Sequence, residues 1–171
     1  MVSDLIDLSR IEYGDLKLNI KGIDLDEFMN SFLISMNSVA KKMNIDISYS
    51  PSHKDLIFAD VQALERIMNN LLDNALKYSE EGTKVEISTK DQGKMIKVMV
   101  ADSGIGVSNE DQEHIFDRFY RTASARASDN KGSGLGLAIV KNLTNSLNGE
   151  VGITTKEPSG SIFWFTLPKP K

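Results

Sequence analysis

Cysteine is absent from this sequence of 171 residues, and histidine occurs only twice, at His53 and His114. Without cysteine the chain can form neither disulfide bonds nor thiolate metal sites, and it suits a reducing compartment. The two histidines lie far apart in the sequence, and no nucleophile motif accompanies either of them. These absences argue against a histidine metal site and against a Ser-His-Asp hydrolase.

Long hydrophobic runs are also missing. No apolar segment approaches the roughly 20 residues that cross a bilayer, and no signal peptide precedes the first charged residues. The net charge is −4, with both signs spread along the chain, whereas nucleic-acid binding requires a basic surface. The apolar and charged fractions, 40% and 26%, are ordinary for one soluble globular domain. We therefore expect a cytoplasmic domain that binds no nucleic acid.

Helices and strands alternate along the chain, as judged from hydrophobic periodicity and capping residues. The predicted helices span 1–12, 24–42, 60–78, 108–116 and 135–147, and the predicted strands span 45–49, 56–58, 85–89, 96–100, 151–155 and 162–167. Residues 117–134 lack apolar periodicity and are rich in small residues and arginine, which predicts a mobile loop. This order predicts an α/β fold, a two-layer sandwich in which helices cover one face of a mixed sheet.

Two of these helices show clear amphipathic patterns. Asp24 is the predicted N-cap of the first, and Glu27 is placed to complete a capping box. The expected buried face of this helix consists of Phe28, Phe32, Leu33, Met36 and Val39. Asp60 is the predicted N-cap of the helix at 60–78. The apolar stripe of that helix consists of Leu64, Ile67, Met68, Leu71, Leu72 and Ala75.

Polar side chains lie opposite this stripe: Asn70, Asn74 and Lys77, with Tyr78 at the helix end. The two asparagines are spaced i, i+4, so their amides lie on one side of the helix. Asparagine is a poor helix former because its side chain competes for the backbone, whereas an amide oxygen suits Mg²⁺ as a ligand. Taken alone, the pattern also fits a solvated helix face.

The segment from Asp102 to Gly106 follows a predicted strand directly. A carboxylate placed before glycines, which let the backbone approach a ligand, can accept a hydrogen bond from an exocyclic amine such as that of adenine. The alternative is an ordinary β-turn with an acidic first residue.

The glycine-rich run from Gly132 to Leu137 leads into the helix at 135–147. Backbone N–H groups at a helix start, together with the helix dipole, attract phosphate. The run matches neither the dinucleotide fingerprint nor the P-loop. A flexible linker is the alternative, but a linker would not run directly into a helix core, so phosphate binding is favoured.

A fourth segment, Ile115 to Arg121, gathers aromatic residues and arginines just before the predicted loop. Phe116 and Phe119 could anchor that loop to the core. Arg121 could reach a phosphate, because the guanidinium group matches phosphate geometry. Arginines on a solvated surface are the alternative.

Together and in this order, the four segments resemble the nucleotide-binding boxes of sensor histidine kinases. Residues 69–79 resemble the asparagine box, 102–107 the first glycine box, 115–121 the phenylalanine box and 132–137 the second glycine box. Gly160-Ser161 resembles, more weakly, the final glycine turn of the family. The resemblance implies the Bergerat-type ATP-binding fold that is shared with gyrase, Hsp90 and MutL-type proteins.

Carried over residue by residue, the resemblance implies ATP and Mg²⁺ as ligands. Asn70 and Asn74 would hold Mg²⁺, and Asn70, Lys77 and Arg121 would be the catalytic residues. The implied nucleotide-binding residues are Asn70, Asn74, Lys77, Tyr78, Asp102, Gly104, Ile105, Gly106, Tyr120, Arg121, Gly132, Ser133, Gly134, Leu135, Gly136 and Leu137.

Among these, Tyr78 would pack on the adenine and Asp102 would bind its amino group. The residue at position 70 distinguishes kinases from ATPases in this superfamily, because related ATPases carry there a glutamate that activates water, where this chain has Asn70. An amide cannot take up a proton at neutral pH, so hydrolysis should be slow. Asn70 therefore favours a kinase, with the base for phosphotransfer supplied along with the acceptor.

The chain departs from the family in lacking a phospho-acceptor histidine on an upstream helical hairpin. His53 lies in a predicted turn and His114 in the phenylalanine box. Residues 1–13 resemble the C-terminal end of the hairpin's second helix, and 14–171 would form the catalytic domain. We therefore expect a mainly monomeric fragment of a membrane-anchored kinase, with the hairpin as its direct partner and a response regulator as an indirect one.

Two alternatives from other classes stay open. One is an ATP-gated binding module that transfers no phosphate, and the other is an anti-sigma-type serine kinase of related fold. The helix remnant at residues 1–12 and the segment Asp-Arg-Phe-Tyr-Arg count against the serine kinase.

Overall fold

A five-stranded mixed sheet forms one layer of the fold in the computed structural model, which describes residues 5, 6, 8, 9, 16–52, 56–127 and 132–170. The strand order is β2-β4-β5-β7-β6. The strands are β2 (Asp46–Ser50), β4 (Lys84–Asp91), β5 (Met95–Ala101), β6 (Val151–Thr155) and β7 (Ser161–Pro168). β2 runs parallel to β4, and the other neighbours are antiparallel.

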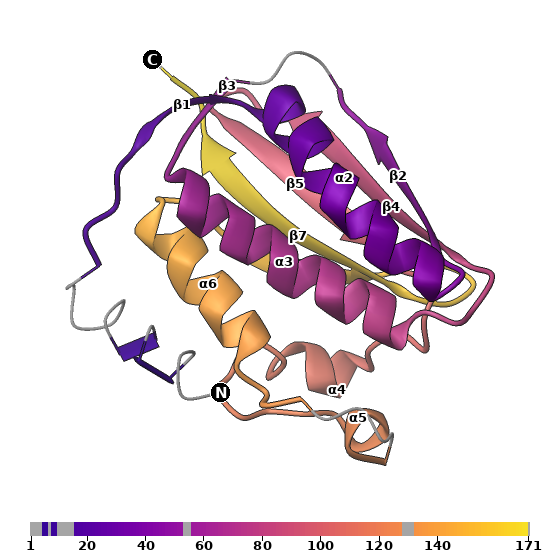
Figure 1. The fold of residues 1–171 in the computed structure, drawn as a ribbon. Coiled ribbons are helices and arrows are strands. Elements are labelled where there is room, and N and C mark those ends of the chain that lie inside the picture. The colour runs from indigo at the N-terminus through magenta and orange to yellow at the C-terminus, as the bar shows by residue number, and fades with distance from the viewer. Residues whose placement is uncertain (1–4, 7, 10–15, 53–55, 128–131, 171) are drawn as a thin grey trace.

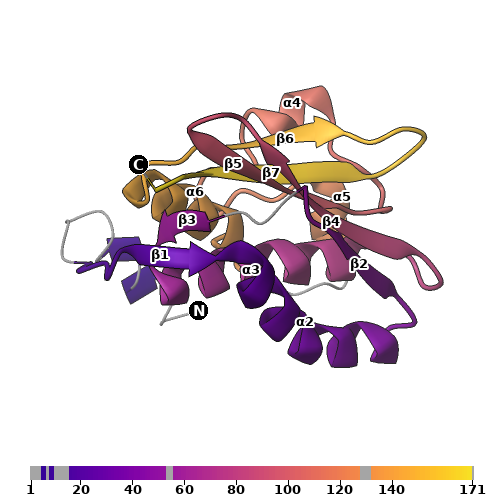
Figure 2. The ribbon, with the colours of Figure 1, turned by 90° about the horizontal axis from the view of Figure 1, so that it is seen from above.

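Three helices form the second layer: α2 (Leu25–Lys42), α3 (Val61–Tyr78) and α6 (Gly136–Ser146). All three lie on the same face of the sheet (Figures 1 and 2). The two-layer α/β sandwich predicted from the sequence is therefore confirmed.

Alternation of buried residues in the central strands creates the core beneath the helices. Every second residue of β5 is buried, as are Phe163, Phe165 and Leu167 of β7. Because successive side chains of a strand point to opposite faces, this pattern fixes which face the helices cover. Phe165 is fully buried at the centre of this layer.

Helix α3 is the central helix and has the stripe that the sequence predicts. All six predicted apolar residues of the stripe are buried, together with Ala63 and Leu76. The predicted N-cap is confirmed, since Asp60 Oδ1 accepts a hydrogen bond from the Ala63 N–H at 3.0 Å. Asp60 Oδ2 accepts a second hydrogen bond from the Asn19 N–H at 2.7 Å, which ties the chain before β1 to the start of α3.

A small second sheet was not predicted. β1 (Lys21–Asp24) pairs antiparallel with β3 (Leu56–Ala59). The sequence places the strands near residues 45–49 and 56–58 on either side of one turn, but the structure puts them in different sheets. β1 gave no signal because only one of its residues, Ile23, is buried.

The buried face of α2 differs from the predicted one. The buried residues are Leu25, Met29, Leu33, Met36 and Ala40. Phe28 and Phe32 are only partly buried and stack on each other, with ring centroids 5.7 Å apart, whereas Val39 is 46% exposed. The aromatic pair lies at the flank of the helix, beside Val61 at the start of α3, so it marks an edge of the buried face. The N-cap is confirmed, since Asp24 accepts hydrogen bonds from the backbone of Asp26 and Glu27.

The sequence predicts one helix at 108–116 and a loop at 117–134, but the structure has two short helices in this region. α4 (Asn109–Gln112) is capped by Ser108 as predicted but ends before residue 116, and α5 (Ala123–Ala127) lies within the predicted loop. Residues 128–131 of that loop lie outside the described residues, as does most of the predicted helix at 1–12. Of that helix, Leu5, Ile6, Leu8 and Ser9 are helical, and Leu8 is buried in the core. Within the described ranges, no helix has the length and hydropathy of a membrane span.

Replacing Met29 by alanine tests the corrected face of α2. We expect Met29→Ala to lower the free energy of unfolding by about 2–5 kcal/mol, because its side chain is fully buried. Val39→Ala, a change at a residue that the sequence assigns to the core, should alter it by less than about 0.5 kcal/mol. Chemical denaturation of both variants makes the comparison. Equal losses would contradict the observed face.

Candidate functional site

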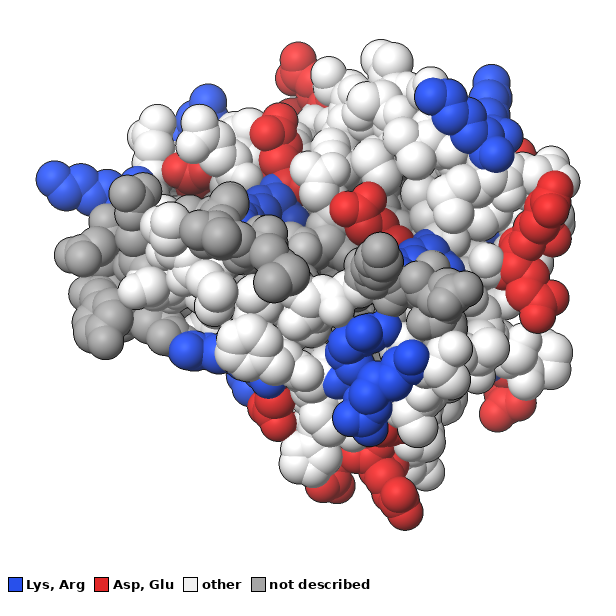
Figure 3. Space-filling model, turned by 60° about the horizontal axis from the view of Figure 1, so that its bottom comes forward, with Lys and Arg blue, Asp and Glu red and all other residues white. Residues whose placement is uncertain are grey.

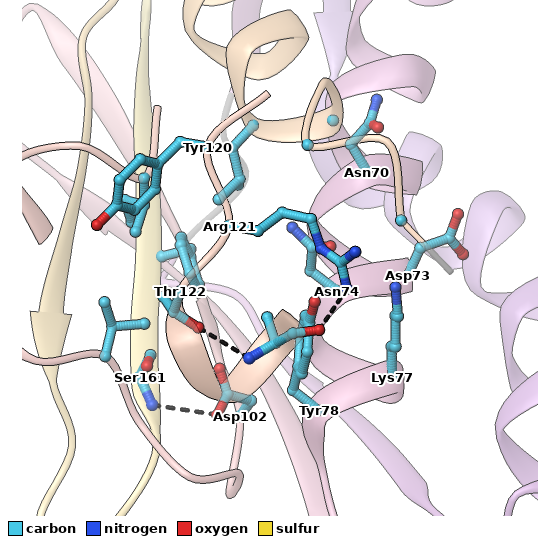
Figure 4. Close-up of a pocket in the computed structure, with 18 of the residues that line it drawn as sticks. Asn70, Asp73, Asn74, Lys77, Tyr78, Asp102, Tyr120, Arg121, Thr122 and Ser161 are labelled. Carbon is cyan, nitrogen blue, oxygen red and sulfur yellow. Dashed lines mark hydrogen bonds between the residues drawn. The ribbon is translucent and has the colours of Figure 1, made fainter. Parts of the chain in front are cut away.

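A cavity of about 400 Å³ opens between α3, α6, the segment after β5 and the segment between α4 and α6. It brings together most of the residues that the sequence predicts for the site (Figure 4). The predicted residues that line it are Asn70, Asn74, Lys77, Tyr78, Asp102, Ile105, Gly106, Tyr120, Arg121, Gly132, Ser133, Gly134, Gly136 and Leu137.

Gly104 and Leu135 are the predicted site residues that do not line the cavity. Gly104 instead allows a close backbone approach, because a Cβ atom there would lie 2.3 Å from the Tyr78 carbonyl oxygen. This contact joins the segment after β5 to the end of α3, where Ser79 and Gly104 form an isolated β-bridge. Leu135 is 1% exposed and belongs to the core at the N-terminus of α6.

Asp102 is a buried carboxylate, 5% exposed, at the wall of the cavity. Its Oδ1 accepts hydrogen bonds from the backbone N–H groups of Gly104 at 2.9 Å and Ser161 at 3.1 Å. Among the described residues, none donates a hydrogen bond to Oδ2. Burial raises the pKa of this carboxyl, although the two N–H groups and the positive charge of Lys156 oppose the rise. The side chain is therefore held in place with one oxygen left to accept a hydrogen bond from a ligand.

Two cations share the cavity with this carboxylate. Burial lowers the pKa of the Lys77 ammonium, and the positive charge of Arg121 lowers it further. The Arg121 guanidinium donates a hydrogen bond to the carbonyl oxygen of Ala125 in α5, which directs it along the cavity wall (Figure 4). Like charges in a partly buried site repel, so an anion between them is favoured.

Two amides on α3 face the same space. Asn70 Nδ2 donates a hydrogen bond to the Arg66 carbonyl oxygen at 2.8 Å, one turn back along the helix. Its Oδ1 is then directed at Gly136, where a Cβ atom would lie only 2.8 Å away. The glycine leaves room for this amide oxygen at the start of α6. Asn74 lies one turn further along α3 and also lines the cavity.

These amide oxygens, together with the carboxylate of Asp73, are the oxygen ligands that α3 offers to a hard cation in the cavity. In the described part of the chain, no group of three or more histidine, aspartate or glutamate side chains is placed to hold a metal ion. Neutral amide oxygens fit Mg²⁺, which keeps several waters and takes its remaining oxygens from phosphates.

The segment before α6 is fixed at Gly134. The Phe119 N–H donates a hydrogen bond to the Gly134 carbonyl oxygen at 2.9 Å. Gly134 has a φ of 71°, and a Cβ atom there would lie 2.7 Å from the Phe119 backbone. The left-handed conformation favours glycine, and the close approach to the Phe119 backbone requires it. Phe119 itself has a φ of 60°, so the chain turns sharply on both sides of this contact.

Sequence reasoning missed the walls of the cavity. The additional lining residues are Asp73, Val107, Ile115, Thr122, Ala125, Ile139, Ser161 and Phe163. Val107 and Ile115 lie within the predicted boxes at 102–107 and 115–121, Asp73 lies between Asn70 and Asn74, and Ser161 belongs to the weak Gly160-Ser161 match. The other four lie outside every predicted box, so no local motif marks them.

The arrangement suits a ligand with a hydrogen-bond donor on a flat apolar body and anionic groups elsewhere. Figure 4 shows Asp102 and Ser161 on one side of the cavity and Asn70, Asn74 and Lys77 on the side of α3. The face of the molecule that carries α4 and α5 has basic side chains near its middle, with acidic ones among and around them (Figure 3). The protein as a whole has a net charge of −4.

Residues 59–171, more than half of the chain, match the family described as histidine kinase-, DNA gyrase B-, and HSP90-like ATPases. The chain belongs to this family. The expectation drawn from the four boxes is therefore confirmed at the level of the family.

Relatives within this family are named as sensor kinases. The sensor-like histidine kinase SenX3 of Mycobacterium tuberculosis is 34% identical over 168 residues, which cover 98% of this chain and 41% of the relative. The sensor histidine kinase WalK of Bacillus subtilis is 33% identical over 171 residues, which cover 98% of this chain and 28% of the relative. The chain thus spans less than half the length of these relatives.

Solved structures of histidine kinases share the fold. Full-length ShkA in complex with AMPPNP superposes with a TM-score of 0.85 at 28% identity, over 99% of this chain and 35% of that one. The nucleotide-free catalytic domain of histidine kinase ThkA gives a TM-score of 0.78 at 27% identity, over 90% of this chain and 100% of that one. The sheet and helices described above are therefore those of a histidine kinase catalytic domain.

Replacing Gly134 by alanine tests the contact between Gly134 and Phe119, which fixes the segment before α6. We expect Gly134→Ala to lower the free energy of unfolding by at least about 1–2 kcal/mol, because alanine is strained at positive φ and would collide with the Phe119 backbone. Gly132→Ala is the matched control, since its added Cβ would meet only the end of the flexible Lys77 side chain. Thermal unfolding of both variants measures the difference, and equal stability would contradict the assigned role of Gly134.

Proposed function

We propose that this domain binds Mg-ATP and donates the γ-phosphoryl group to a histidine on the dimerisation hairpin of a two-component sensor kinase. One observation carries the proposal: the buried Asp102 carboxylate shares a cavity with the cations Lys77 and Arg121. The names of the relatives as sensor histidine kinases and the AMPPNP held by ShkA support an adenine nucleotide as the ligand.

The base would lie against Tyr78 and the apolar lining residues Ile105 and Phe163. Asp102 Oδ2 would accept a hydrogen bond from the exocyclic amino group of adenine. Guanine carries a carbonyl oxygen at the equivalent position, which would face a carboxylate with no proton between them. The site should therefore prefer ATP to GTP.

The phosphates would extend toward α3 and the start of α6. Lys77 and Arg121 would balance their negative charge, and Asn70 and Asn74 would hold Mg²⁺ through their amide oxygens. When bound, Mg²⁺ would neutralise charge on the phosphate oxygens. The N-terminus of α6, which follows Gly134, adds backbone N–H groups suited to an anion.

Transfer would form a bond between the γ-phosphorus and an imidazole nitrogen of the acceptor histidine. The bond from that phosphorus to the bridging oxygen breaks, ADP leaves, and the imidazole proton passes to a base that arrives with the acceptor. Asn70 cannot act as that base, because an amide takes up no proton at neutral pH. This chemistry favours phosphotransfer over hydrolysis of ATP by water.

Two other functions use the same cavity. An ATP-gated binding module would bind the nucleotide and transfer nothing, and an anti-sigma-type serine kinase would phosphorylate a partner's serine. The relatives named as sensor histidine kinases favour the histidine acceptor.

A phosphotransfer assay separates the three functions. The domain is incubated with ATP labelled at the γ-phosphorus, Mg²⁺ and a separately purified hairpin protein that carries an acceptor histidine. We expect label on the hairpin that survives alkali and is lost in acid, as a phosphohistidine requires. A hairpin with alanine in place of that histidine is the control.

Each other outcome contradicts the proposal. Bound ATP with no transfer in any mixture would favour the binding module. Label that survives acid on a serine would favour the serine kinase. Rapid release of free phosphate without a hairpin would show that the Asn70 argument is wrong.

A further inference from the structure

One charged side chain beside Asp102 has no place in the cavity. Lys156 lies between β6 and β7 and does not line the site. Its Nζ donates hydrogen bonds to Ser103 Oγ at 3.2 Å and to Glu86 Oε2 at 3.4 Å. The Lys156 side chain is 23% exposed. Lys156 is thus hydrogen-bonded to Ser103, the residue that follows Asp102, whose carboxylate is proposed to bind adenine.

The turn that carries Lys156 is fastened to Asp102 by backbone contacts. The Asp102 N–H donates to the Ser161 carbonyl oxygen at 2.9 Å, and the Ser161 N–H donates to Asp102 Oδ1 at 3.1 Å. At Gly160, a Cβ atom would lie 2.3 Å from the Asp102 carbonyl oxygen. Within the turn, the Lys156 N–H donates to the Gly160 carbonyl oxygen at 3.1 Å. The backbone of the turn is therefore fixed beside Asp102, and the hydrogen bond to Ser103 holds the Lys156 ammonium on the neighbouring residue.

We propose that Lys156 is a positioning residue of the site, whose charge favours the ionised form of the buried Asp102 carboxylate, the form that accepts a hydrogen bond from the nucleotide. The proposal rests on the proposed function, because it assigns to Asp102 the binding of the adenine amino group. Lys156 acts through Asp102 and Ser103 and touches no nucleotide.

Other charged groups lie around Asp102, and their influence on its ionisation must be distinguished from that of Lys156. Glu86 and Lys84 lie on β4, which is paired with β5, and Lys77 lies at the end of α3. Lys84 binds the other oxygen of Glu86, with Nζ 3.5 Å from Oε1. Among the charged side chains, Lys156 is the one that lowers the pKa of Asp102, against the rise caused by burial. Lys84→Met therefore serves as a matched control, because it removes an equal charge from the same glutamate.

The sign of the effect follows from this balance. The ionised form of Asp102 binds the amino group, so affinity is full above its pKa and falls as the pH falls through it. Removing Lys156 moves that pKa upward, and the loss of affinity then begins at higher pH. A purely structural role for Lys156 would instead weaken binding equally at every pH.

The first test needs no nucleotide. The pKa of Asp102 is measured by carbon NMR of its carboxyl group in the ligand-free wild type and in three variants. We expect Lys156→Met to raise it by roughly half a pH unit or more, while Lys84→Met leaves it unchanged and Lys156→Arg retains the wild-type value. An unchanged pKa in Lys156→Met would overturn the proposal, as would equal shifts in Lys156→Met and Lys84→Met.

The second test connects the charge to binding. ATP is titrated into the wild type and each variant between pH 8 and pH 4.5 with excess Mg²⁺, and each Kd is divided by the wild-type Kd at the same pH. This ratio cancels the protonation of ATP itself. For Lys156→Met it should lie near one at pH 8 and rise toward acid, with a limit of about threefold for a shift of half a pH unit.

The outcomes of the second test distinguish the two proposals. A ratio that stays flat with pH would overturn the role of Lys156, even if ATP binds well. If the wild type bound no ATP at any pH, the proposed function would fail. The carboxyl titration would then still decide whether Lys156 controls Asp102. Circular dichroism of each variant confirms that it is folded.

Discussion

The site depends on one constraint: the Asp102 carboxylate is buried and must be stabilised there by hydrogen bonds from two backbone N–H groups. An ionised carboxylate loses its hydration on burial, and only compensating hydrogen bonds and charge make that tolerable. Asp102 obtains them from Gly104 and Ser161, which belong to different parts of the chain. The arrangement exists only if the segment after β5, the end of α3 and the turn before β7 meet closely, and the glycines at 104 and 160 permit that approach.

The rest of the cavity carries positive charge, which an anionic group of the ligand would balance. Lys77 and Arg121 are close enough for one charge to lower the pKa of the other, so their proximity costs free energy until an anion separates them. Together with the amide oxygens of α3, they form a region that a phosphate chain would satisfy. The fold thus separates a hydrogen-bond acceptor for a base from a cationic region for phosphates.

Much of this could be predicted from the sequence, for identifiable reasons. The stripe of α3, the caps at Asp24, Asp60 and Ser108, and the four boxes are local patterns that physical rules describe directly. β1 could not be predicted, because only one of its own residues, Ile23, is buried. The face of α2 was misplaced because the aromatic pair Phe28 and Phe32 outweighed Met29 in the pattern. The apolar walls of the cavity arise from tertiary packing, which no local motif encodes.

The most direct measurement of the central claim is a calorimetric titration of ATP and GTP, with Mg²⁺, into the wild type and Asp102→Asn. We expect the wild type to bind ATP in a Mg²⁺-sensitive manner and GTP much more weakly. Asp102→Asn should lose about tenfold or more in ATP affinity, as the removal of a charged hydrogen bond implies. Asp46→Asn, a change at an exposed residue of β2, should bind like the wild type. Unchanged ATP affinity in Asp102→Asn would contradict the account.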